Sequence, residues 1–225
     1  MKPSDSVEFL GTDSESRHIR SRDPERTKQD ILDVATQEFS TNGYAGGRVD
    51  AIAAKTQTTK RMIYYYFGSK EQLYSQVLER AYSGIRRVEE HMNLDRLDPE
   101  TALRRLVEFS FDYHHEHPEF VRLVMIENIH NAEHIKQSET VKRTNIPAIT
   151  VLRHLLARGR ESGVFKREID PVDLHFMISA LSFYRVSNAG TFGALYDCDL
   201  NEPRLRERQR RLVTDTIVTF LLSPG

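Results

Sequence analysis

The sequence predicts an all-α fold of about nine helices. Apolar residues recur at steps of three and four through most of the chain, and no run alternates with the period of two that a strand requires. Asp-Pro pairs at 23–24, 98–99 and 170–171 supply an N-cap followed by a first-turn proline, so each pair marks a helix start. With 225 residues, 39% of them hydrophobic, the chain can bury a sizeable core.

The first part of the chain divides into a leader and four helices. Residues 1–23 are polar and mixed in charge, so we expect a disordered leader. Asn42 and Gly43 end the first helix, and the polar stretch TQTT separates two short helices as a turn. Thr59 and Ser69 are good N-caps for the helices that follow them. The predicted helices are 24–42, 49–55, 60–67 and 70–91.

The rest of the chain repeats this pattern. Apolar spacing predicts helices over 98–117, 118–126, 141–160, 170–187 and 203–222. Pro147 should kink or restart the third of these, and the glycine-containing segment 188–199 reads as a loop. We expect two domains, a small one over 24–70 and a larger one over 71–225.

Composition narrows the class of protein. No apolar run approaches the roughly 20 residues of a membrane-spanning helix, and the first 23 residues lack the apolar stretch of a signal peptide. The one cysteine, Cys198, cannot form an intramolecular disulfide, which fits a reducing compartment. We therefore expect a soluble cytoplasmic protein with no membrane partner.

The formal net charge of -1 conceals a local excess of positive charge. Residues 51–70 contain four Lys or Arg residues and no Asp or Glu. A basic element in a neutral chain indicates contact with a polyanion over one small surface. A non-specific nucleic-acid packaging protein would instead need positive charge over much of its surface.

The same segment contains a row of aromatic residues, Tyr64 to Phe67, that no single helix face could bury. Three short helices followed by a basic segment are typical of a helix-turn-helix, whose second helix lies in the major groove of DNA. Ile63 and Phe67, four residues apart, are then expected in the core beside Phe39 and Ile52. Tyr64 and Tyr65 would face phosphates or base edges. Tyr66 could do either.

Residues from about 26 to 78 resemble the amino-terminal domain of the TetR family of bacterial transcriptional regulators. The resemblance lies in the opening helix ILDVATQEFSTNGY and in the segment VDAIAAKTQTTKRMIYYYFGSKEQL. Two positions differ from the family pattern: Gln57 stands where the turn usually has glycine, and Gly47-Arg48 replaces a Thr or Ser pair. The matching positions are Ile52, Ala53, Lys60, Ile63, Tyr64, Tyr65, Tyr66, Phe67, Ser69, Lys70 and Glu71.

The resemblance implies a homodimeric repressor without enzymatic activity or cofactor, which binds a palindromic operator in double-stranded DNA and is released by a small organic ligand. It implies phosphate contacts from Tyr64 and Lys70, with Arg48 as a charged substitute for a lost hydroxyl contact. Base or groove-edge contacts would come from Thr59, Lys60, Arg61 and Tyr65. Arg20 and Arg22 either reach a minor groove as a flexible arm or belong to a solvated leader.

The last two predicted helices indicate a dimerisation surface. Residues 174–186 are apolar nearly all round, and the last helix has a clear apolar stripe. Together they suit a two-helix face that doubles into a four-helix bundle across a two-fold axis, although burial within one subunit is the alternative. The predicted contact residues are Leu181, Leu212, Val213, Ile217 and Phe220.

An effector pocket is expected between the fourth and eighth helices, with an apolar lining and a few polar anchors. Ordinary core packing explains the same residues, because sequence spacing does not distinguish a cavity from a filled core. The candidates are Phe111, Phe120, Met125, Asn128, Phe176, Phe183 and Tyr184.

One motif points to a different class of protein. The stretch HNAEH, from His130 to His134, matches the HxxEH of inverted zinc peptidases, in which the two histidines bind zinc and the glutamate is a base. A zinc hydrolase would also need a third ligand and a substrate cleft, for which no candidate stands out. We predict no metal site, and leave a regulatory metal at His130 and His134 as the alternative.

Overall fold

The computed structural model describes residues 23–224, and all regular secondary structure in that range is helical. The residues of the predicted leader up to position 22, including Arg20 and Arg22, lie outside the described residues. The elements are α1 (Pro24–Gly46), α2 (Val49–Lys55), α3 (Lys60–Phe67), α4 (Lys70–His91), the 3₁₀ turn η1 (Leu94–Arg96), α5 (Pro99–Glu116), α6 (Pro118–Ile129), α7 (Glu133–Gln137), α8 (Glu139–Glu161), α9 (Pro171–Ser187), α10 (Ala189–Tyr196) and α11 (Pro203–Leu222).

The predicted helix starts are confirmed by their capping bonds. The Asp23 carboxylate accepts from the Glu25 N–H at 3.0 Å, Asp98 from Thr101 at 3.0 Å and Asp170 from Val172 at 2.7 Å. Gly43, at φ 70°, interrupts the helical backbone near the end of α1 at the predicted stop.

Three local predictions differ from the structure. The segment predicted as a loop contains α10, and α7 was not predicted, so the described chain has eleven α-helices rather than about nine. Glycines such as Gly193 contributed to the loop prediction. In the structure a Cβ at Gly193 would lie 2.7 Å from the Cys198 carbonyl oxygen, so the glycine allows the chain after α10 to turn back closely against the helix. α8 also continues through Pro147 as one helix, with the proline on its exposed side.

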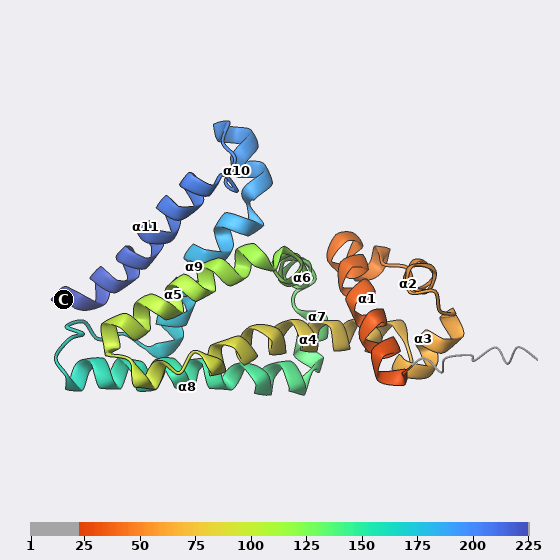
Figure 1. The fold of residues 1–225 in the computed structure, drawn as a ribbon, viewed down its shortest axis with the longest axis horizontal. Coiled ribbons are helices and arrows are strands. Elements are labelled where there is room, and N and C mark those ends of the chain that lie inside the picture. The colour runs from red at the N-terminus through yellow and green to blue at the C-terminus, as the bar shows by residue number, and fades with distance from the viewer. Residues whose placement is uncertain (1–22, 225) are drawn as a thin grey trace, which may run out of the picture.

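The helices form a small head joined to a longer body (Figure 1). α1, α2 and α3 lie at one end, and α4 runs from them into the body beside α8. The head core is built around Ile31, Phe39, Ile52 and Ile63, and it extends into the body through Leu123. A continuous apolar core therefore connects the two parts.

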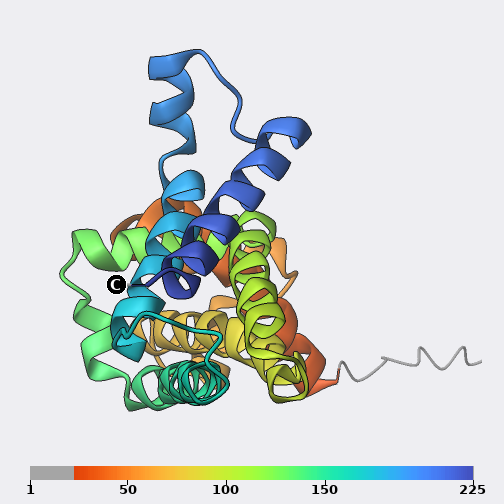
Figure 2. The same cartoon turned by 90° about the vertical axis from the view of Figure 1, so that its left-hand side faces the viewer.

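The body core is formed mainly by α5, α8, α9 and α11. α9, α10 and α11 lie on one side of the body, and α10 projects furthest from it (Figure 2). Among the described residues, no helix has both the length and the apolar character needed to cross a membrane.

Candidate nucleic-acid interface and effector domain

α2 and α3 form a helix-turn-helix at the far end of the head (Figure 1). Ile63 and Phe67 are buried beside Phe39 and Ile52, as predicted. Tyr65 is 77% exposed and Tyr64 38%, so both point outward as expected. Tyr66, which the sequence left open, is half-buried against the head core. Burial of one side of α3 explains the row of aromatics, because Ile63 and Phe67 on that side anchor the helix while the opposite side is free.

The turn between α2 and α3 forms without the usual glycine. Gln57 takes a left-handed backbone with φ 51°, a conformation that glycine adopts more easily. The Thr56 hydroxyl donates to the Ile52 carbonyl at 2.8 Å and closes α2. The Thr59 hydroxyl accepts from the Met62 N–H at 3.2 Å and caps α3, as predicted.

The predicted cationic contacts differ in how freely they can reach DNA. Arg48 and Arg61 are exposed and have no ion-pair partner within residues 23–224. Lys60 pairs with Asp50 at 3.2 Å, a surface ion pair that is weak enough to exchange for a phosphate. The Lys70 ammonium donates to the Ala45 carbonyl at 3.3 Å and lies 4.9 Å from the centroid of the Tyr44 ring. Lys70 therefore also fastens α4 to the end of α1.

A buried carboxylate that the sequence did not indicate holds the helix-turn-helix on α1. Glu38 is 5% exposed and accepts from the Arg48 N–H at 3.2 Å and from the Lys55 ammonium at 3.3 Å. Burial pushes its pKa upward, but the hydrogen bonds from Arg48, Lys55 and Asn42 together hold the pKa below its ordinary value. Its partners lie ten and seventeen positions away, which is why helical spacing did not reveal it.

The lowered pKa of Glu38 predicts how the stability of the head depends on pH. A carboxyl with a depressed pKa in the folded state stabilises fully above its unfolded pKa, and the contribution is lost as pH falls through the folded value. Glu38→Gln should remove this contribution and cost roughly 1–3 kcal/mol at neutral pH. Urea unfolding at pH 7 and below pH 4 measures it: the gap between variant and wild type should narrow in acid. A gap that stays constant with pH would contradict this role for the Glu38 charge.

A second buried carboxylate, that of Glu127, joins the head to the body. It also contacts His134, the second histidine of the HNAEH motif. Glu127 is 1% exposed and accepts from the Tyr74 hydroxyl at 3.1 Å and from the N–H groups of His134 and Ile135 at 3.2 Å. The His134 Nδ1 lies 3.1 Å from the same carboxylate, and its ring packs against Tyr44 and Tyr74. Burial, and then the nearby Glu127 charge, raise the pKa of Tyr74 well above its usual range, so the phenol remains a donor.

The first histidine of the motif does not take part in these contacts around Glu127. His130 is exposed at the end of α6, whereas His134 contacts Glu127. No group of three or more His, Cys, Asp or Glu side chains in the described part of the chain could hold a metal ion. The role of His134 is therefore structural in this conformation, at the joint between α1, α4 and α6.

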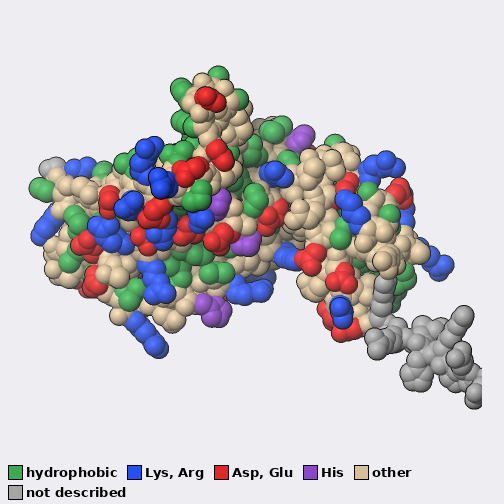
Figure 3. Space-filling model, turned by 45° about the horizontal axis from the view of Figure 1, so that its top comes forward, with side chains coloured by type: hydrophobic (Ala, Val, Ile, Leu, Met, Phe, Trp, Pro, Cys, Tyr) green, Lys and Arg blue, Asp and Glu red, His purple; other side chains and the backbone are tan. Residues whose placement is uncertain are grey.

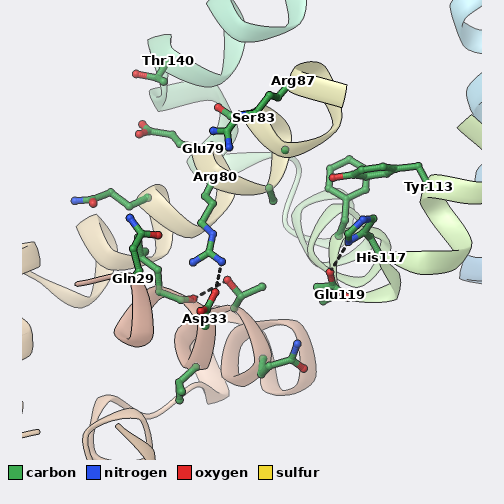
Figure 4. A pocket seen from close by; sticks show the side chains of 18 of the residues that line it. Gln29, Asp33, Glu79, Arg80, Ser83, Arg87, Tyr113, His117, Glu119 and Thr140 are labelled. Carbon is green, nitrogen blue, oxygen red and sulfur yellow. Dashed lines mark hydrogen bonds and ion pairs between the residues drawn. The ribbon is translucent and has the colours of Figure 1, made fainter. Parts of the chain in front are cut away.

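A large open cleft of about 1080 Å³ lies between α1 and the body. Figure 4 shows Arg80 on α4 reaching across it to Asp33 on α1, and His117 Nδ1 lies 3.2 Å from the Glu119 carboxylate at the opposite wall. Its charged groups are of both signs, and α1 contributes one of them, Asp33, together with several uncharged polar side chains. It is thus a groove between head and body, and of the seven predicted effector residues only Phe120 lines it.

The seven predicted effector residues do not line one cavity. Phe111 and Phe120 are buried, Met125 and Phe183 are half-buried, and Asn128 is exposed. Phe176, at 72%, and Tyr184, at 55%, are exposed on the outer side of α9. One face of α9 is therefore buried in the body and the other is exposed, so the predicted cover of a second face is not provided within the single subunit.

One predicted dimerisation residue is wrong. Ile217 is fully buried in the body core of a single subunit, so it is not available to a partner. Leu212, at 65%, and Leu181, at 39%, are exposed, while Val213 and Phe220 are half-buried. The apolar residues of α11 lie partly against the subunit's own core and partly on its surface. Their spacing in the sequence does not distinguish the two positions.

The fold and its exposed helix-turn-helix define a DNA-binding transcriptional regulator, and comparisons with known proteins agree. Residues 31–77 match the family model for bacterial regulatory proteins of the tetR family, and residues 99–217 match the tetracyclin repressor-like C-terminal domain. The chain belongs to the TetR family, whose members are non-enzymatic regulators that typically form dimers and are released by effectors.

Its relatives include named repressors. The chain is 36% identical to the HTH-type transcriptional repressor NicS of Pseudomonas putida over 197 residues, covering 88% of this chain and 93% of the relative. It is 32% identical to the HTH-type transcriptional repressor SCO4008 of Streptomyces coelicolor over 75% of this chain and 82% of the relative. The solved structure of the putative regulator SCO4942 from Streptomyces coelicolor superposes with a TM-score of 0.64 at 26% identity, over 84% of this chain and 97% of that one.

Proposed function

We propose that this repressor binds a palindromic operator as a homodimer, with α3 of each subunit in a major groove, and that an organic effector bound in the body releases it. The observation that carries the proposal is the outer face of α3. Arg61, Tyr64 and Tyr65 are exposed there while Ile63 and Phe67 anchor the helix, so a rigid donor-bearing surface faces away from the protein. The site of action would be the cytoplasm, where the operator is found.

Arg61 and Lys70 are assigned different roles, which separate in their salt dependence. Arg61→Ala should change sequence preference, because a free guanidinium on α3 can read a base edge. Lys70→Ala should weaken binding to all sequences and reduce the salt slope by about one, since it removes a phosphate contact. Binding of each variant to operator and random DNA at several salt concentrations measures both effects. Unchanged sequence preference in Arg61→Ala would contradict base readout by that residue.

The proposed dimer surface combines α9, α10 and α11. Seven of the thirteen exposed large hydrophobic side chains in the described residues belong to these three helices. Hydrophobic side chains are also visible over the projecting α10 in Figure 3. Apolar exposure on this scale marks a protein interface. The seven side chains, here called the outer patch, are Val172, Phe176, Leu181, Tyr184, Leu195, Tyr196 and Leu212.

α10 extends the surface predicted from sequence, which included only α9 and α11. A hollow of about 170 Å³ lies between these helices. Its lining includes two residues predicted for the effector pocket, Phe111 and Tyr184. It also includes three residues predicted for the dimer contact, Leu181, Leu212 and Val213. An isologous two-fold contact would place the outer patch against its own copy. The partner subunit would then cover the hollow. Contact with the partner would also account for the exposure of Phe176 and Tyr184 in one subunit, so these side chains need no role in binding an effector.

In this proposal the effector changes the spacing of the two heads. α4 belongs to both parts, and its Tyr74 is held by Glu127 at the joint. A ligand that prefers one arrangement of α4 in the body shifts the population toward the corresponding placement of α3. Repression is lost when that placement no longer fits the operator.

A further inference from the structure

The body contains a group of buried and half-buried polar side chains that converge on one cavity. They lie on α4, α5 and α9 around a small, partly open cavity of about 30 Å³, whose walls are otherwise apolar, including Leu152 and Ile178. Arg86, Glu89, Ser110 and His175 line it. Polar groups are costly inside a helical bundle, and their convergence on one cavity is a feature of ligand sites.

Arg86 is the strongest of these features. It is 7% exposed, its Nη1 is paired with the Glu89 carboxylate, and its Nε donates to the Asn145 amide oxygen at 3.1 Å. Within residues 23–224 no acceptor is paired with its other terminal nitrogen, Nη2. A guanidinium in this position offers donors in a planar fork that matches a carboxylate.

Burying the Glu89 carboxylate that now pairs with Arg86 costs desolvation free energy. Burial raises the pKa of Glu89, although the Arg86 guanidinium and its hydrogen bond oppose this shift. Both residues lie on α4, one turn apart, so the pair closes within a single helix and does not bind α4 to another helix. A second carboxylate could therefore take the place of Glu89 without breaking a contact between helices.

The pKa values of two histidines near Arg86 are lowered, which disfavours a second positive charge beside it. His114 lies one turn beyond Ser110 on α5, is buried, and its Nδ1 has no hydrogen-bond partner in the described chain. Burial lowers the pKa of His114 to about 4, with Arg86 and His175 contributing. The His175 Nδ1 lies 3.1 Å from the Ser179 hydroxyl, and burial lowers its pKa too. One fixed cation with neutral polar neighbours suits a monoanion better than a dianion.

We propose that the effector of this repressor is a small organic monocarboxylate, bound with its carboxylate on Arg86 and its apolar part between α5, α8 and α9. The inference rests on the proposed function, because it assigns the ligand of the same effector domain. At about 30 Å³ the cavity has room for a water-sized group only. The structure is then the closed form, and a ligand must separate α4 from α8 to enter. Movement of α4 is the change that the head would sense.

A thermal-shift screen of the full-length protein tests the assignment without DNA. The probes are aliphatic and aromatic monocarboxylates from acetate through hexanoate to benzoate and phenylacetate, each beside its primary amide. We expect carboxylates with an apolar part to raise Tm and their amides to leave it unchanged. If no carboxylate raises Tm, or if the amides act equally, the assignment is wrong.

Three variants locate the site. Arg86→Met should weaken binding of the best carboxylate by roughly ten- to a hundredfold, while Arg87→Met, which removes the exposed neighbouring arginine that lines the outer cleft (Figure 4), should not. Glu89→Gln should strengthen it by about tenfold, because the competing charge is removed while the shape is kept. Equal affinities in Glu89→Gln and wild type would overturn the proposal even if Arg86→Met failed to fold.

The two proposals fail in distinguishable ways. Operator binding that persists while every carboxylate is inert would refute the ligand class and leave the repressor intact. A carboxylate that raises Tm in a protein without operator preference would do the reverse.

Discussion

Leu212→Glu is expected to convert the dimer to a monomer and to weaken operator binding by roughly 10²–10⁴-fold, the gain that linking two binding heads supplies. Leu212 is 65% exposed in one subunit and lies in the outer patch on α11. The proposed two-fold contact brings this patch against its copy, so two substituted carboxylates would enter an apolar interface together. Sedimentation velocity gives the mass of the variant in solution. Fluorescence anisotropy with an operator fragment selected from genomic DNA gives its affinity for DNA.

Ile146→Glu is the matched control. Ile146 lies on α8, outside the outer patch, and is exposed to 63%, nearly the same extent as Leu212. The charge and the exposure are therefore similar, and only the location differs. Ile146→Glu should remain dimeric with wild-type operator affinity. If both variants dissociate, or neither does, the assignment of the interface to α9, α10 and α11 is wrong.

Glu127→Ala should be the most destabilising single substitution considered, at about 3–5 kcal/mol. It leaves the buried Tyr74 hydroxyl, the His134 ring and two backbone N–H groups without their acceptor. The desolvation cost of unsatisfied buried donors exceeds the net value of a hydrogen bond, which is why the loss is large. Urea unfolding followed by circular dichroism measures it.

Two comparisons separate the network from general effects of removing a glutamate. Glu127→Gln keeps the shape and one acceptor oxygen, so its loss should be clearly smaller than that of Glu127→Ala. Glu139→Ala removes an exposed carboxylate at the start of α8 and should change stability by no more than about 0.5 kcal/mol. If Glu127→Ala were as mild as Glu139→Ala, the network would not hold head and body together.

Features set by neighbouring residues were predictable from the sequence. Thr59, Ser69 and the Asp-Pro pairs act within three residues of themselves, so the helix starts that they predict are confirmed. The apolar spacing in α3 separated Ile63 and Phe67 from Tyr64 and Tyr65 correctly, because a short helix on a small core has one buried side. The family resemblance rests on this same local segment.

Features set by distant contacts were not predictable. Glu127 meets Tyr74 across 53 positions, and nothing in its local pattern distinguishes it from a surface glutamate. Ile217 and Leu212 share one apolar stripe but face opposite sides of α11, toward the core and toward the surface. The same holds for α9. An apolar side chain such as Phe176 could line a pocket or contact a partner subunit, and the sequence pattern is the same in both cases.

The central claim is that two α3 helices, one from each subunit, occupy successive major-groove faces of one operator. Guanine-N7 methylation interference tests it most directly, because N7 lies in the major groove. On a fragment selected from genomic DNA, two clusters of interfering guanines should appear, related by a dyad and about one helical turn or a multiple of it apart. A single cluster, or no interference at any guanine N7 of the bound fragment, would contradict the account.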